Sequence, residues 1–103
     1  MSKIRRLTME TKYIKNKDVI FTKIESEAVL LDGKGGTYFG LDDVGTFIWN
    51  KIEEEMNFNQ ILEQMLNEYQ IEPDSVKQVR VEVTNFIEEL ERKSLVHRVE
   101  NND

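Results

Sequence analysis

Acidic side chains form most of the residue groups in this chain that could do chemistry. Carboxylates stand next to one another at Asp42–Asp43, at Glu53–Glu55 and again between residues 88 and 91. General acid–base catalysis needs two carboxylates in different, partly buried environments, because only then do their pKa values separate. These groups instead have the positions of a helix cap and of two solvated helix faces, so we expect no catalysis from them.

His97 and the loop around Lys34 are the other candidates for a chemical site. His97 is the single histidine and there is no cysteine, so neither a metal-ligand spacing nor a nucleophile with an oriented base is visible. Gly33 to Gly35 resembles part of a phosphate-binding loop. In such a loop, however, Ser or Thr and then a helix follow the lysine, whereas this segment leads into a predicted strand. The sequence therefore predicts no enzyme, no metal site and no cofactor.

The composition predicts one domain in the cytoplasm. The 103 residues are enough for a single domain, and the lack of cysteine fits a reducing compartment. No apolar run approaches the ~20 residues needed to span a bilayer. Basic residues near the N-terminus are not followed by an apolar stretch, so we expect neither a secretory signal nor a membrane partner.

Charge is unevenly distributed along the chain. Residues 1–17 contain six basic residues and one acid, a balance of +5, which leaves −11 for the remainder of a chain whose net charge is −6. Phosphate binding is driven by basic charge, so the acidic body argues against nucleic acid as a partner. Residues 1–17 lack sustained periodicity and predict a mobile basic arm, and residues 100–103 predict a polar tail.

Three short runs rich in β-branched, aromatic and other apolar residues predict strands. They cover residues 19–24, 28–32 and 37–39. The connections are short, and the glycine-rich one at 33–36 can turn the chain without steric cost. The three runs therefore predict an antiparallel meander, and a last extended segment at 95–99 could pair back on the sheet.

Three helices are predicted to follow the strands. Asp42 or Asp43 is expected to cap the first, and a capping-box pair beginning at Asn57 starts the second. Pro73 marks the first turn of the third helix, which is predicted to run to about residue 93. Gly45 in the first turn of the first helix predicts close approach of that helix to the sheet. The order β-β-β-α-α-α is an α+β fold with helices on one face, close to a winged helix-turn-helix.

Thr37, Tyr38 and Phe39 give the sharpest functional hypothesis. As the last strand of the meander they have one edge without a local partner, and neither proline nor charge blocks it. A peptide added there would gain main-chain hydrogen bonds. The alternative is that residues 95–99 or the N-terminal arm cover this edge. Val81 lies off the apolar stripe of the third helix and is either a single exposed valine or an apolar contact for a partner.

A longer motif surrounds this strand. The segment from Gly36 to Gly45, followed by Phe47-Ile48-Trp49, resembles the G-x-Y-Y-x-L-N-x-x-G-x-x-I-W core of the PqqD-like family. Later positions follow the order of that family, and the resemblance covers roughly residues 19 to 99. Phe39 stands in place of the second tyrosine and Asp42 in place of the asparagine.

The resemblance implies a function. PqqD-like domains are recognition elements for ribosomally synthesised, post-translationally modified peptides, and they bind the leader of a precursor and present its core to modifying enzymes. For residues 18–99 this implies a non-catalytic peptide-binding domain, most like the stand-alone leader-binding protein of lasso peptide pathways. Its partners would be a leader peptidase and a cyclase.

The resemblance also implies where the leader lies, as a strand added to the third strand in a groove closed by the third helix. The strand side would be Thr37, Tyr38 and Phe39, and the helix side Val76, Lys77, Arg80, Val81 and Thr84. The two basic residues of the helix side would then meet acidic leader residues.

A winged-helix regulator that binds DNA is the alternative function. It requires a basic recognition helix, whereas the third predicted helix has four basic and five acidic residues between positions 73 and 93. We therefore prefer the peptide-binding interpretation.

Overall fold

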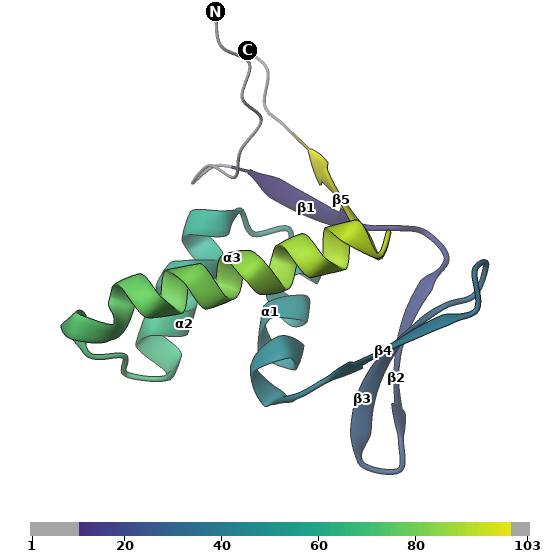
Figure 1. Ribbon diagram of the computed structural model, residues 1–103, viewed down its shortest axis with the longest axis horizontal. Coiled ribbons are helices and arrows are strands. Elements are labelled where there is room, and N and C mark those ends of the chain that lie inside the picture. The colour runs from purple at the N-terminus through teal and green to yellow at the C-terminus, as the bar shows by residue number, and fades with distance from the viewer. Residues whose placement is uncertain (1–10, 100–103) are drawn as a thin grey trace, which may run out of the picture.

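The computed structural model describes residues 11–99, which form two small antiparallel sheets and three α-helices (Figure 1). The strands are β1 (Lys12–Lys15), β2 (Val19–Ile24), β3 (Glu27–Asp32), β4 (Thr37–Leu41) and β5 (Val96–Val99). The helices are α1 (Asp43–Glu53), α2 (Phe58–Glu68) and α3 (Val76–Arg92), the last preceded by a 3₁₀ turn at Pro73–Ser75. This is the predicted α+β architecture with one additional strand pair. None of the helices in residues 11–99 is long and apolar enough to cross a membrane.

The three predicted strands form one sheet in the order β2-β3-β4, with both pairs antiparallel. The register places Phe21, Leu30 and Phe39 in one row across the sheet. Leu30 is fully buried and the two phenylalanines pack against the same core, so this is the face that the helices cover. Side chains alternate along a strand, so Tyr38 lies on the other face, where it is exposed.

The additional pair joins the two ends of the described chain. β1 pairs with β5 in an antiparallel register that places Tyr13 opposite Arg98. Tyr13 is fully buried, and the Phe58 N–H donates to the Thr11 carbonyl at 2.9 Å. The prediction of a mobile arm is therefore wrong for residues 11–17, because a buried aromatic side chain and main-chain bonds to β5 and α2 hold this segment. Residues 1–10 and 100–103, which contain the rest of the predicted arm and the polar tail, lie outside the described residues.

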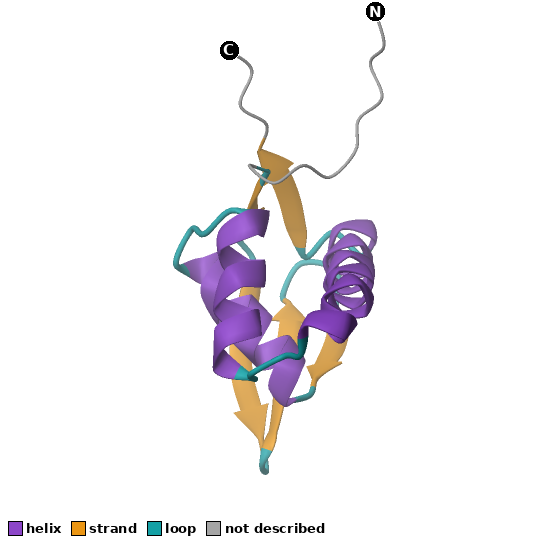
Figure 2. Ribbon diagram, turned by 90° about the vertical axis from the view of Figure 1, so that its left-hand side faces the viewer, coloured by secondary structure: helices purple, strands orange, loops and turns teal. Residues whose placement is uncertain are grey.

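The final segment thus pairs with β1 and not with the three-stranded sheet. In Figures 1 and 2 the β1–β5 pair lies toward one end of the molecule, and the β2–β3 hairpin projects at the other. The core between them is built from side chains of all three helices, including the fully buried Ile48, Trp49, Ile61 and Ile87.

The helix starts agree with the predicted caps. The Asp42 carboxylate accepts a hydrogen bond from the Gly45 N–H at 2.8 Å. Asn57 and Gln60 form the complete capping box, each side chain accepting from the other residue's N–H at 2.8 and 2.9 Å. The aspartate that follows β4 therefore ends the strand and starts α1, which places the helix directly beside the edge strand.

The open edge of β4 and the adjacent flank of α3

Strand β4 is an edge strand. It pairs with β3 on one side, and within residues 11–99 no strand pairs with its other side. The sequence suggested two segments that could cover this edge, residues 95–99 and the N-terminal arm. In the structure β5 pairs with β1 instead, and residues 1–10 of the arm lie outside the described residues. The described chain thus leaves this edge open.

The hydrogen-bond phase of the sheet shows which main-chain groups point to the open edge. The Gly33 N–H donates to the Asp18 carbonyl at 3.0 Å, one position beyond the paired ends of β2 and β3. In an antiparallel pair, hydrogen-bonded positions alternate with positions that are not hydrogen-bonded. Odd-numbered residues of β3 therefore bond to β2, and its even-numbered residues bond to β4.

Even-numbered residues of β3 are paired with odd-numbered residues of β4, as Leu30 is with Phe39. The N–H and C=O groups of Tyr38 and Gly40 must therefore point away from β3, toward the open edge. Unpaired edge groups of this kind can accept a further strand. The sequence of β4, Thr-Tyr-Phe-Gly-Leu, contains no proline and no charge that would prevent this.

One flank of α3 lies beside this edge. The Phe39 and Phe86 rings are 6.3 Å apart between centroids, inclined at 51°. A Cβ atom added to Gly45 would lie 3.2 Å from Leu41 Cδ2 and 3.2 Å from two ring carbons of Phe86. The absence of a side chain at Gly45 thus lets strand, helix α1 and helix α3 approach closely, which confirms the close approach predicted for this glycine and adds Phe86 to it.

The side chains nearest to Phe86 on the helix surface follow from helical geometry. Successive residues are rotated by about 100°, so Val79 and Glu82 point within about 20° and 40° of Phe86. We call Val79, Glu82 and Phe86 the Phe86 flank. Val79 and Phe86 are half-buried and pack against the core, whereas Glu82 is exposed.

The helix-side residues predicted from the sequence point elsewhere. By the same geometry Arg80, Val81, Thr84 and Lys77 are rotated from Phe86 by about 120° to 180°, and Val76 by about 80°. Val81 is 47% exposed. The structure therefore brings Phe39 together with Phe86 and not with the predicted helix-side residues, whose part in peptide binding stays a prediction. In the sequence, Phe86 lies in the apolar stripe of the third helix, a pattern that predicts a core position and does not by itself indicate a binding surface.

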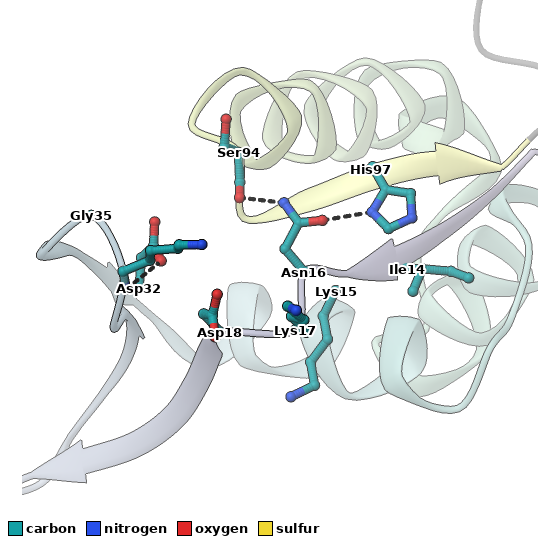
Figure 3. A pocket seen from close by; sticks show the side chains of 10 residues that line it. Ile14, Lys15, Asn16, Lys17, Asp18, Asp32, Gly35, Ser94 and His97 are labelled. Atoms are coloured by element: carbon teal, nitrogen blue, oxygen red, sulfur yellow. Dashed lines mark hydrogen bonds between the residues drawn. The ribbon is translucent and has the colours of Figure 1, made fainter.

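A hollow of about 720 Å³ lies between the β1–β5 pair and the β3–β4 turn (Figure 3). His97 Nδ1 lies 2.6 Å from Asn16 Oδ1, and the amide nitrogen of Asn16 donates to the Ser94 carbonyl. These bonds tie the loop after β1 to the start of β5, so they give Asn16 and His97 a structural role. Within residues 11–99 no group of three or more His, Cys, Asp or Glu side chains could hold a metal ion.

The fold and the edge define a class of protein: a winged-helix-like α+β domain whose outer strand is open beside a helix. Residues 27–96 match the family model of coenzyme PQQ synthesis protein D (PqqD), so the chain belongs to the PqqD family. This confirms the family expected from the sequence motif.

A solved structure supports the same assignment. "TbiB1 in Complex with the TbiA(beta) Leader Peptide" is similar to this chain with a TM-score of 0.73 and 31% sequence identity, over 85% of this chain and 99% of that one. A comparison with curated proteins finds no match.

Proposed function

We propose that this protein binds the leader segment of a ribosomally synthesised precursor peptide, and that the leader adds as a strand to the open edge of β4. The observation that carries the proposal is the outward direction of the Tyr38 and Gly40 main-chain groups at an edge flanked by Phe86. The similarity to TbiB1, whose structure contains the TbiA(beta) leader peptide, supports a leader as the added strand.

In strand addition, the main chain and the side chains of the bound peptide would make different contributions to binding. Main-chain bonds to Tyr38 and Gly40 supply affinity for any extended peptide, and the alternate side chains of the peptide supply specificity. A peptide residue opposite Phe39 would lie on the helix-covered face, next to the half-buried rings of Phe39 and Phe86. An apolar side chain suits this position, because it would remove ring surface from water. The next residue along the peptide would lie on the face of Tyr38.

We further propose that the domain acts without catalysis in the cytoplasm and presents the bound leader to a leader peptidase and a cyclase, as in lasso peptide biosynthesis. The candidate site consists of main-chain groups and apolar rings, which suit binding and not bond cleavage. Its partner is a peptide and not a nucleic acid or a membrane, and no cofactor is required for this role. The winged-helix DNA-binding alternative is not favoured, because the domain matches the PqqD family and α3 has more acidic than basic residues.

Hydrogen exchange tests the proposal at residue level. With the labelled TbiA(beta) leader, or the leader of a precursor encoded beside this protein, the Tyr38 and Gly40 amides should exchange more slowly when the peptide is bound. The Phe21 and Lys23 amides provide the matched control, because the same hydrogen-bond phase directs them to the outer edge of β2. Protection at β2 instead of β4, or binding with no change at either edge, would contradict strand addition to β4.

A further inference from the structure

The Phe86 flank of α3 has acidic charge from Glu82, and none of its three residues is basic. Glu82 is exposed and accepts a hydrogen bond at 2.9 Å from the uncharged amide of Gln78. Glu89, one turn beyond Phe86 and rotated from it by about 60°, is 3.9 Å from the exposed guanidinium of Arg92. This pair offsets part of the Glu89 charge, so Glu82 is the main source of negative charge on this side of α3. A peptide on this edge would therefore meet negative potential from the helix.

The end of β4 adds to this potential. Asp42 and Asp43 follow the strand directly, and both are exposed. The Asp42 carboxylate caps α1 by accepting from the Gly45 N–H. The Leu41 end of the open edge is thus bordered by carboxylates from the start of α1.

Two of the three basic residues of α3 lie on other faces of the helix than Glu82. Lys77 and Arg80 are rotated from Glu82 by about 140° and 160° around the helix. Glu82 and Glu89 therefore lie on the side of α3 next to Phe86, whereas Lys77 and Arg80 lie on other faces, as do Glu88 and Glu91. An acidic binding surface favours a basic partner, because opposite charges attract across an interface, and it disfavours an acidic partner, because like charges repel.

We infer that the peptide recognised at this edge is basic, with Lys or Arg two residues from the apolar side chain that packs on Phe39 and Phe86. Glu82 lies about 6 Å along the helix from Phe86, close to the spacing of about 6.6 Å between alternate residues of a strand. A peptide residue two positions from the apolar one points to the same face and comes level with Glu82. The inference rests on the proposed function, and it gives the leader the opposite charge to the one expected from Lys77 and Arg80.

Selection from a peptide library tests the inference without knowledge of the natural leader. An mRNA-display library of random 12-residue peptides is panned on the full chain, on Tyr38→Pro and on Glu82→Lys. Peptides that depend on the β4 edge are those recovered by the wild type and lost with Tyr38→Pro. Among them we expect Lys and Arg to exceed Asp and Glu two positions from an apolar residue, and we expect Glu82→Lys to reverse this preference.

The outcomes distinguish a failure of the charge inference from a failure of the proposed strand addition. If the wild type enriches no peptide beyond Tyr38→Pro, strand addition itself is refuted. If it enriches edge-dependent peptides that are neutral or acidic, strand addition stands and the charge inference is overturned. If Glu82→Lys enriches peptides with the same preference for Lys and Arg as the wild type, the charge inference is overturned as well.

A titration then assigns the charge to Glu82. With the most enriched basic peptide, Glu82→Gln should weaken binding by about 2- to 5-fold at low salt, as removal of one exposed ion pair does. Glu88→Gln is the matched control on the same helix, because Glu88 is exposed and rotated from Phe86 by about 160°. The difference between the two variants should vanish in about 0.5 M salt, where charges are screened within a few ångströms. Equal effects of the two substitutions would overturn the assignment.

Discussion

Replacement of Tyr38 by proline is the most direct perturbation of the proposed binding mode. It removes one outward-pointing N–H from β4 and leaves the ladder to β3 intact, because Tyr38 does not bond to β3. Proline is tolerated on an edge strand when its missing N–H faces solvent. The free protein should therefore fold, whereas the bound leader should lose a partner for one of its carbonyl groups.

The size of the effect follows from the cost of an unpaired buried acceptor. A group of this kind that loses its hydrogen-bond partner costs about 1–3 kcal/mol. At about 1.4 kcal/mol for each factor of ten, Kd for the leader should rise by roughly 5- to 140-fold. The measurement is a fluorescence-anisotropy titration of a labelled leader, with far-ultraviolet circular dichroism and a thermal melt to establish that each variant is folded.

Two control variants distinguish the effect of the lost Tyr38 N–H on Kd from the effect of the lost side chain and from the general effect of proline in an edge strand. Tyr38→Ala keeps the N–H and removes the exposed ring, so it isolates the side-chain contribution. Lys23→Pro places proline at an outward position of the opposite edge strand, β2, so it should leave Kd unchanged. Unchanged affinity in a folded Tyr38→Pro variant, or an equal loss in Lys23→Pro, would refute addition of the leader to β4.

Two further predictions concern the packing that positions the edge. Gly45→Ala should lower the free energy of unfolding, measured by urea denaturation, by about 1 kcal/mol. The new Cβ would lie 3.2 Å from Leu41 and from Phe86. The overpacking costs about 1–3 kcal/mol, which is more than the gain of about 1 kcal/mol in helix propensity. A more stable Gly45→Ala variant would show that the three elements are less tightly packed than the contacts indicate. Tyr13→Ala should lower the free energy of unfolding by about 3 kcal/mol or more, because it empties a fully buried position. Its exposed neighbour Lys12 is the control, since Lys12→Ala should change the free energy of unfolding by less than about 0.5 kcal/mol. A Tyr13→Ala variant as stable as Lys12→Ala would mean that β1 is dispensable for the stability of the fold.

Local chemistry in the sequence predicted much of the fold. The three strands of the meander, the cap at Asp42 and the capping box at Asn57 were all visible, because each depends on residues within a few positions of one another. The sequence also left one edge of β4 without a local partner, and the structure then showed that β5 pairs with β1 and does not cover this edge. The strand-side prediction of Thr37, Tyr38 and Phe39 could therefore be made before any tertiary contact was known.

The strand pair β1–β5 could not be predicted in the same way. β1 is four residues long and begins and ends with lysine, so its pattern is too short to distinguish from a solvated arm. What makes it a strand is a partner more than 80 positions away in the chain, together with the burial of Tyr13 against the helices. Non-local pairing of this kind leaves little trace in local propensity.

The sequence predicted a strand with no local partner on one edge, followed by amphipathic helices, and it contains the motif of the PqqD family. Which flank of α3 lies beside that strand depends on the tertiary structure. An apolar stripe shows which face of a helix is buried, but its two borders look alike until the crossing of helix and sheet is known. Gly45 allows Phe86 to approach Phe39 and Leu41. By helical geometry Glu82 is the charged residue of α3 rotated least from Phe86, whereas Lys77 and Arg80 are rotated from it by more than about 100°.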